Sequence, residues 1–323
     1  MNSFRWAEPQ SIEQAASLLA AGEGKTCLMS GGTDLLDQLK EGIVEPDIVI
    51  DLAAIPGLSY IKKEKDGLSI GALTTIAELA ADPGVKQAYP GLSQAASLIA
   101  SPQLRNVGTV GGNLCQRPRC WYFRNSEIIC RKKGGSLCYA YKGRNKYHAI
   151  LGGGMCYIVY PSDLAPMLIA LGAGVTIASP RGERTMPLAE FYALPSKNVR
   201  RENSLGPDEL VREVRIPPAG KGGRSAYLKL EERETWDFAL VSCAVASGLG
   251  KSPSDLRIVL GGVAPVPWRL EKAEAALRGK KPTEASVRSA VRAALEEAKP
   301  LAENGYKKQL IEVAVSRTLL SFA

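Results

Sequence analysis

The sequence predicts an α+β protein in which strands and helices are grouped rather than alternating along the chain. Residues 59–72 form a hairpin pattern around an Asp66-Gly67 turn, which is typical of antiparallel strands. Three strand patterns at 225–233, 238–248 and 255–267 precede helical patterns around 270–278, 284–298 and 307–321. A dinucleotide fold would instead alternate strand and helix, so we expect antiparallel sheets with segregated helices.

Composition excludes several classes of protein. The chain has 323 residues, 45% of them hydrophobic, enough to bury the cores of two or three domains. The formal net charge of +8 suggests nucleic-acid binding, but aromatic residues make up 6% and no nucleic-acid reader motif is present. We find no apolar run approaching the roughly 20 residues of a membrane span and no signal-peptide pattern at the N-terminus. We therefore expect a soluble globular protein.

The N-terminal region predicts a helix followed by a turn. Ser11 and Gln14 form a capping-box pattern at the start of an amphipathic helix that Gly22 ends. Residues 22–26 read GEGKT and resemble a phosphate-binding loop. That motif requires a further glycine where Leu19 stands and a helix afterwards, whereas a strand pattern follows here. We therefore interpret residues 22–26 as a helix-to-strand turn.

Two glycine-rich loops are candidates for binding phosphate. In the first, Ser30-Gly31-Gly32-Thr33-Asp34 lies between a strand and a helix, and a strand at 47–52 completes a β-α-β unit. Taken alone, this loop fits a pyrophosphate cradle and a plain glycine turn equally well. The second loop spans residues 101–114, where a hydroxyl, two glycines and an amide suit phosphate and ribose oxygens: Thr109, Gly111, Gly112 and Asn113. Two such loops favour the binding interpretation.

Five of the seven cysteines lie between Cys115 and Cys156. Four of them have the spacing C-x9-C-x7-C-x17-C: Cys120, Cys130, Cys138 and Cys156. Structural zinc usually takes two tight cysteine pairs, and disulfides suit short secreted domains with an even number of cysteines. An iron–sulfur cluster takes four thiolates from widely spaced loops and fits this pattern best.

The cysteine segment is also strongly basic. Its single acid, Glu127, is outnumbered by nine cations: Arg117, Arg119, Arg124, Arg131, Lys132, Lys133, Lys142, Arg144 and Lys146. Cations would offset the negative charge of a thiolate-bound cluster, although a solvated basic loop is the ordinary interpretation of such a run. His148 is the single histidine, so a Ser-His-Asp hydrolase has little support, and we expect a packed or hydrogen-bonded loop histidine.

The sequence after Cys156 contains further patterns that are typical of helices and strands. Ser162 or Asp163 can cap a helix that begins near 164, and strand patterns follow at 175–186 and 209–217. Residues 217–224 are rich in proline and glycine and predict a linker. Cys27 and Cys243 lie in apolar strand patterns, where a buried cysteine is expected.

Several segments together resemble a known family: SGGTDLL, TVGGNL, YPSDLAP, YLKLEER to DFALVS, and GGVAPVPWR. They look like the FAD-binding (medium) subunit of molybdenum hydroxylases, the xanthine dehydrogenase family. The cysteine insertion is most similar to the FAD/[4Fe-4S] subunit of bacterial periplasmic-type aldehyde oxidoreductase. The resemblance implies a FAD-binding domain of the PCMH/vanillyl-alcohol-oxidase type at 1–218, with subdomains of about 1–56 and 57–218 and an insertion at 115–156. A smaller α+β domain of the CO dehydrogenase flavoprotein type, with a three-stranded antiparallel sheet, would follow at 222–323.

The resemblance also assigns residues to cofactors. It implies FAD contacts from Met29, Ser30, Gly31, Gly32, Thr33, Asp34, Leu35, Ala100, Ser101, Thr109, Gly112, Asn113, Asp163 and Lys229. It implies that Cys120, Cys130, Cys138 and Cys156 hold the [4Fe-4S] cluster and that Cys115 does not. No residue of this chain is expected to contact the organic substrate.

The implied function is electron transfer within a heterotrimer. A large subunit would carry the molybdenum cofactor, a small subunit two [2Fe-2S] clusters, and this chain would pass electrons through FAD to an external acceptor. The complex would lie in the cytoplasm, or in the periplasm if a signal-bearing partner exports it. Three alternatives are a subunit like that of 4-hydroxybenzoyl-CoA reductase, a self-contained flavin reductase, and a zinc-stapled binding module without catalysis.

Overall fold

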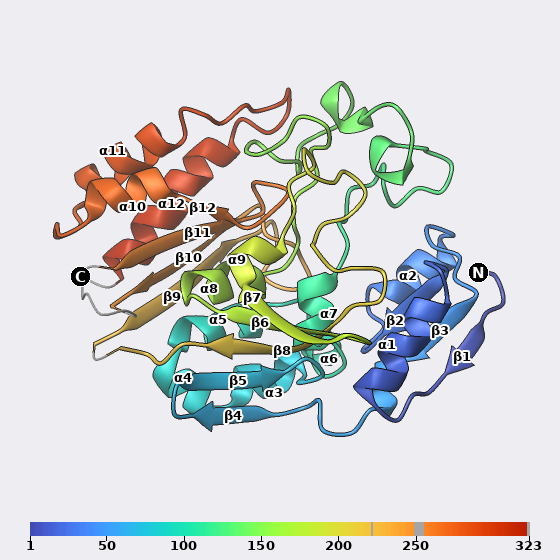
Figure 1. Cartoon of the computed structure of the whole chain (residues 1–323). Helices are drawn as coiled ribbons and strands as arrows, with labels where there is room; N and C mark the ends of the chain where they lie inside the picture. Colours follow the sequence, from blue (N-terminus) through green and yellow to red (C-terminus); the bar gives the residue numbers. More distant parts are fainter. Residues whose placement is uncertain (221, 249–254, 322–323) are drawn as a thin grey trace.

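Three β-sheets organise the fold (Figure 1). The computed structural model describes residues 1–220, 222–248 and 255–321. One sheet has three parallel strands, and the other two, of five and four strands, are antiparallel. This arrangement confirms the predicted α+β class.

The parallel sheet forms the N-terminal unit. Its elements are β1 (Arg5–Ala7), α1 (Ile12–Ala21), β2 (Thr26–Met29), α2 (Leu35–Lys40), β3 (Ile48–Asp51) and the 3-10 turn η1 (Leu52–Ala54), with strand order β1-β3-β2. Residues 22–25 form the predicted helix-to-strand turn, and Thr26 already belongs to β2. The capping box is only half present: Ser11 Oγ accepts from Gln14 N at 3.2 Å, but Gln14 Oε1 accepts from Gln10 N rather than from Ser11 N.

The five-stranded sheet has the order β4-β5-β8-β6-β7. Its strands are β4 (Ile61–Glu64), β5 (Gly67–Gly71), β6 (Gly174–Ser179), β7 (Gly182–Pro187) and β8 (Leu210–Ile216). The helices of this region are α3 (Ile76–Ala81), α4 (Pro83–Ala88), α5 (Pro90–Ser97), α6 (Pro102–Arg105), α7 (Val110–Cys115), α8 (Leu164–Ala170) and α9 (Leu188–Phe191). The predicted hairpin is β4–β5, and Gly67 has φ +139°, which favours glycine.

The C-terminal sheet has one strand more than predicted. Its strands are β9 (Arg224–Leu230), β10 (Val241–Ser247), β11 (Leu256–Gly261) and β12 (Trp268–Arg269), covered by α10 (Glu271–Leu277), α11 (Glu284–Ala294) and α12 (Lys307–Leu320). The two residues of β12 are too few to show an alternating pattern, which is why the sequence predicted three strands. Lys221, within the predicted linker, lies outside the described residues.

The cysteine segment forms the green loops between the C-terminal helices and the N-terminal unit in Figure 1, with 3-10 turns η2 (Arg131–Lys133) and η3 (Tyr139–Tyr141). The chain just before α12 holds these loops in place. Asn145 exchanges hydrogen bonds with Glu303, and Asn304 Nδ2 donates to His148 O at 3.0 Å. Of the helices in the described ranges, none is long and apolar enough to cross a membrane.

Lys307, the first residue of α12, is fully buried. Its Nζ donates to Tyr147 O at 2.9 Å and to Gly262 O at 2.6 Å, so it links the cysteine segment to the C-terminal sheet. Burial lowers the pKa of the Lys307 ammonium to about 7, from an ordinary value of 10.5. Between these two values the unfolded chain binds a proton that the folded chain does not.

Lys307 should therefore make the stability of the protein depend on pH. The free energy of unfolding of the wild type should rise between pH 7 and 10.5, with a contribution from this group of at most about 1.4 kcal/mol per pH unit. Lys307→Met should remove that contribution, whereas Lys272→Met, at an exposed position of α10, should keep it. Urea unfolding across this pH range measures both slopes; parallel curves for wild type and Lys307→Met would contradict the assignment.

Candidate functional site

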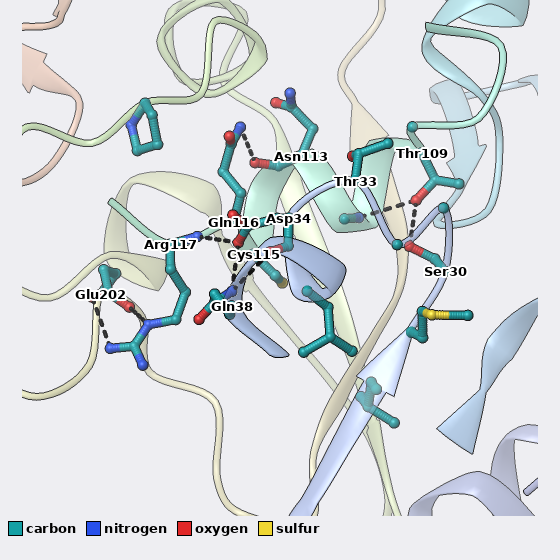
Figure 2. Close-up of a pocket in the computed structure, with 18 of the residues that line it drawn as sticks. Ser30, Thr33, Asp34, Gln38, Thr109, Asn113, Cys115, Gln116, Arg117 and Glu202 are labelled. Atoms are coloured by element: carbon teal, nitrogen blue, oxygen red, sulfur yellow. Dashed lines mark hydrogen bonds and ion pairs between the residues drawn. The ribbon is translucent and has the colours of Figure 1, made fainter. Parts of the chain in front are cut away.

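The two glycine loops meet and form one wall (Figure 2). Thr109 Oγ1 donates to Ser30 Oγ at 3.0 Å and accepts from Gly112 N at 3.2 Å. The loops approach so closely that a Cβ on Gly31 would lie 2.0 Å from Val107 O. Gly32 has φ +69°, which glycine adopts without strain. Both glycines are therefore required by the backbone, independently of any ligand.

A cavity of about 840 Å³ opens beside this wall, and we call it the large cavity. Twelve of the fourteen residues predicted to contact FAD line it: Met29, Ser30, Gly31, Gly32, Thr33, Asp34, Leu35, Ala100, Thr109, Gly112, Asn113 and Asp163. The other two lie behind its wall. Ser101 Oγ caps α6 by accepting from Leu104 N, and Lys229 Nζ donates to Leu98 O and Asp237 O.

Asp163 is available to the cavity because its neighbour caps the helix. Ser162 Oγ accepts from Ala165 N at 3.0 Å, while Asp163 makes no capping bond to α8. Asp163 instead accepts from Tyr227 OH at 2.6 Å and pairs with Lys229 Nζ at 3.2 Å. Burial raises the pKa of the Asp163 carboxyl, and the Lys229 ammonium acts in the opposite direction.

Asp34 lines the cavity, but its carboxylate already has four donors. Gln38 Nε2 donates at 3.0 Å and Arg117 N at 2.9 Å, as Figure 2 shows. The guanidinium groups of Arg119 and Arg124 lie 3.1 and 2.6 Å away. Asp34 therefore joins the first glycine loop to the start of the cysteine segment.

Sequence reasoning missed the loop at 236–238, which lines the large cavity. Trp236 N donates to Ala100 O at 3.0 Å, and both residues have a positive φ, +54° and +47°. Two non-glycine residues in this region mark backbone strain at the edge of the cavity. Trp236 carried no signal, because it lies between two strand patterns, and Asp237 and Phe238 belong to the DFALVS segment, which was used only for the family resemblance.

The four predicted cluster cysteines line one small cavity of about 10 Å³, together with His148. We call it the cysteine cavity. His148 Nε2 lies 3.2 Å from Cys120 Sγ, so the histidine is packed and hydrogen-bonded, as expected. Its burial lowers the pKa of His148 to about 4. A hydrogen bond with Cys156, the largest effect, lowers the pKa of the Cys138 thiol to about 6, and the pKa of Cys156 is raised.

The remaining cysteines lie elsewhere. Cys115 lines the large cavity, and burial raises the pKa of its thiol to about 12. Cys243 is fully buried in β10, as expected, whereas Cys27 in β2 is half-buried and lines the large cavity.

The four thiols of the cysteine cavity are ligands that both zinc and iron–sulfur clusters can take. In residues 1–220, 222–248 and 255–321, no three His, Cys, Asp or Glu side chains are grouped closely enough to hold a metal ion. Structural zinc requires four donors to converge on one ion, so these thiols do not have zinc geometry. In a [4Fe-4S] cube each iron takes one thiolate, and the sulfurs therefore stay farther apart. Four thiolates are the right type and number of ligands for such a cube. The cysteine cavity, however, has room for about one water, so the hydrogen bond between Cys138 and Cys156 would have to break and the two side chains move apart to admit the cluster.

A buried cation lies beside these thiols. Lys132 lines the cysteine cavity, is 5% exposed, and pairs with Glu202 at 2.6 Å. Glu202 also pairs with Arg117 at 3.1 Å (Figure 2). Lys142 and Arg144 are exposed, as the basic-loop interpretation predicts. Of these basic residues, Lys132 is therefore buried beside the thiols, whereas Lys142 and Arg144 lie on the solvent-exposed surface.

Comparison with known proteins identifies the family. Residues 2–219 match the FAD binding domain in molybdopterin dehydrogenase, and residues 226–322 match the CO dehydrogenase flavoprotein C-terminal domain. The aldehyde oxidoreductase FAD-binding subunit PaoB of Escherichia coli (strain K12) is 41% identical over 253 residues, covering 77% of this chain and 78% of PaoB. The carbon monoxide dehydrogenase medium chain of Hydrogenophaga pseudoflava is 30% identical over 321 residues, 98% of this chain and 96% of that one.

The fold is shared as well. A structure of carbon monoxide dehydrogenase from Hydrogenophaga pseudoflava, lacking the Mo-pyranopterin moiety of its cofactor, superposes with a TM-score of 0.75 at 30% identity. The alignment covers 99% of this chain and 96% of the other. Together with the two matched domains and the relatives above, it confirms the family that the sequence motifs indicated: this chain is a FAD-binding subunit of the molybdenum hydroxylase family of oxidoreductases.

Proposed function

We propose that this chain is the electron-transfer subunit of a heterotrimeric aldehyde oxidoreductase of the molybdenum hydroxylase family, and that it binds FAD and one [4Fe-4S] cluster. The observation that carries the proposal is that both glycine loops line one cavity, in a chain 41% identical to an aldehyde oxidoreductase FAD-binding subunit. A volume of about 840 Å³ is in the range of small-molecule cofactor sites. The two matched domains at 2–219 and 226–322 support a division at the 217–224 linker.

Different residues around the large cavity would contact different parts of FAD. The backbone of Ser30 to Thr33 takes the pyrophosphate, because a turn with glycines leaves its amides accessible to phosphate oxygens. Thr109 and Asn113 face it from the second loop. Asp163, held by Tyr227 and Lys229, is a buried acceptor for a hydroxyl or ring N–H of the cofactor. FAD, when bound, supplies the capacity to take electrons singly and to release them in pairs.

The cysteine cavity provides the second electron carrier. Cys120, Cys130, Cys138 and Cys156 would each bind one iron, and the buried Lys132 would offset part of the negative charge of the cluster. His148, beside Cys120 Sγ, orients that thiol. The aromatic side chains of Tyr122 and Phe123 line the same cavity and exclude water from it.

The partners follow from the family. A large subunit with the molybdenum cofactor would oxidise the substrate, and a small subunit with two [2Fe-2S] clusters would deliver the electrons here. The medium-chain relative supports this assembly.

The glycine loops should be necessary for FAD. Gly31→Ala brings a Cβ to 2.0 Å from Val107 O, so the two loops must separate and the chain should be purified with little flavin. Thr109→Val removes the hydroxyl that joins Ser30 to Gly112 and should weaken FAD binding about tenfold. Flavin absorbance per chain and titration of the apoprotein with FAD measure both effects.

A matched glycine variant controls for the substitution itself. Gly305→Ala adds its Cβ in open space, 4.0 Å from Pro300, and should retain full flavin content. Thermal unfolding shows whether each variant is folded. A folded Gly31→Ala protein with wild-type FAD affinity would contradict the proposed site.

The cysteine cavity should bind iron and acid-labile sulfide in equal amounts, about four of each per chain. Cys130→Ser should lose both, together with the low-temperature EPR signal that appears on reduction with dithionite. Cys115→Ser, in the large cavity, and Cys243→Ser, in β10, should keep iron, sulfide and signal. Stoichiometric zinc without sulfide in the anaerobically purified protein would instead support the zinc-stapled alternative, and equal iron in Cys130→Ser and wild type would exclude this ligand.

A further inference from the structure

Exposed apolar side chains are concentrated in the cysteine segment, which lies at the outer edge of the molecule (Figure 1). In the described part of the chain, fourteen large hydrophobic side chains are exposed, and seven of them lie between residues 121 and 155. These seven are 37–65% exposed: Trp121, Ile129, Leu137, Tyr139, Tyr141, Tyr147 and Met155. Single exposed hydrophobic residues are ordinary, whereas a group of them in one place marks an interaction site.

Six aromatic rings of this segment pack on one another, and we call them the aromatic face: Trp121, Tyr122, Tyr139, Tyr141, Tyr147 and Tyr157. The centroid of the Trp121 ring lies 5.7 Å from that of Tyr147 and 6.1 Å from that of Tyr122. Tyr122 stacks on Tyr139, and Tyr141 stacks on Tyr157. Tyr139 and Tyr141 both belong to η3 and join the two groups. Because the rings hold one another in place, they lose little side-chain entropy when a partner binds.

The aromatic face lies on the outer side of the loops that carry the four cysteines. Trp121, Tyr139 and Tyr157 each directly follow one of those cysteines in the sequence. The cysteines line the cysteine cavity, whereas Trp121 and Tyr139 remain 37% and 43% exposed. A partner on this face would therefore cover the proposed cluster site from solvent.

The charges around the aromatic face are almost all positive. Lys142 and Arg144 are exposed and make no ion pair with any residue that the structure describes. Lys146 Nζ lies 5.2 Å from the centroid of the Tyr147 ring. Glu127 is the single acid of the segment. Such a surface attracts an acidic partner, whereas a second copy of this chain would bring like charges together.

The composition of the face suits a permanent contact. Permanent interfaces are more apolar than transient ones, and aromatic residues and Met are enriched at interfaces. Transient redox encounters bury less surface. Tyr139, Tyr141 and Tyr147 are 39–57% exposed, so they would face water for most of the time if the partner bound only briefly.

We propose that the aromatic face is the contact with the large subunit, which covers it with an apolar surface that carries Asp and Glu opposite Lys142 and Arg144. The inference rests on the proposed function, because that function supplies the two partner subunits. The small subunit must approach the flavin, and among the described residues that line the large cavity none belongs to the aromatic face. The large subunit is therefore the partner left for this face.

Photo-cross-linking in the co-expressed heterotrimer identifies what covers the face. Tyr141, at 57% exposure, is replaced by p-benzoylphenylalanine, and the complex is irradiated. We expect a product that joins this chain to the large subunit, with Asp and Glu near the linked residue in its peptide map. The same replacement at Trp6, which is 43% exposed in β1, controls for chance capture and should not link to that peptide.

Charge reversal measures the strength of the contact. The double variant Lys142→Glu and Arg144→Glu should weaken binding of the large subunit at least about tenfold, because two attractions become repulsions. Its FAD and iron content should not change. Lys62→Glu with Lys63→Glu, at exposed positions of β4, makes the same exchange and should bind like the wild type. Gel filtration of each heterotrimer over a range of concentrations gives the affinity.

Two results would overturn the inference. One is an intact heterotrimer in which Tyr141 links to the small subunit, to a second copy of this chain or to nothing. The other is unchanged affinity in the folded variant with both charges reversed. Failure of the proposed function is distinguishable, because a heterotrimer that links as expected but holds no FAD or iron would contradict that function alone.

Discussion

Both proposed cofactor sites depend on the carboxylate of Asp34, which joins the first glycine loop to the start of the cysteine segment. It accepts from Gln38 within α2 and from the backbone N–H and two guanidinium groups of residues 117–124. Hydrogen bonds to a charged group each contribute about 1.5–3 kcal/mol, and this set is partly shielded from water, with Arg124 12% exposed. The contact fixes where Cys120 stands relative to the large cavity. It thereby places the start of the cysteine segment next to the glycine loops.

A second set of contacts holds the far side of the same segment. Lys307 and Asn304 donate to backbone carbonyls of residues 147–149, and Lys132 pairs with Glu202 beside the thiols. The long loops between the cysteines contain little helix or strand. Side-chain contacts therefore take the place of the regular backbone hydrogen bonds that a helix or strand would provide. The C-terminal sheet and its helices thus support the cysteine cavity, whose lining residues lie between Cys120 and Ile158.

The sequence could predict those features that depend on local pattern or on a motif. The β4–β5 hairpin, the β2-α2-β3 unit and the grouping of four cysteines around one cavity all follow from spacing and turn residues. The two-residue strand β12 could not, because it is shorter than any periodic signal. The place of Lys229 behind Asp163, the contact of His148 with Cys120 and the position of Trp236 depend on long-range packing, which no local pattern encodes. The choice between Ser162 and Asp163 as helix cap was likewise decided by a tertiary partner, Tyr227.

The central claim is that two redox cofactors lie side by side in this chain, one at the glycine loops and one among four cysteines. A crystal structure of the anaerobically purified protein, with diffraction data on both sides of the iron absorption edge, tests it most directly. The account predicts FAD density along Ser30 to Thr33 and an iron anomalous peak enclosed by Cys120, Cys130, Cys138 and Cys156. Flavin density elsewhere, or four thiols around a zinc ion or no metal in a flavin-loaded crystal, would contradict it.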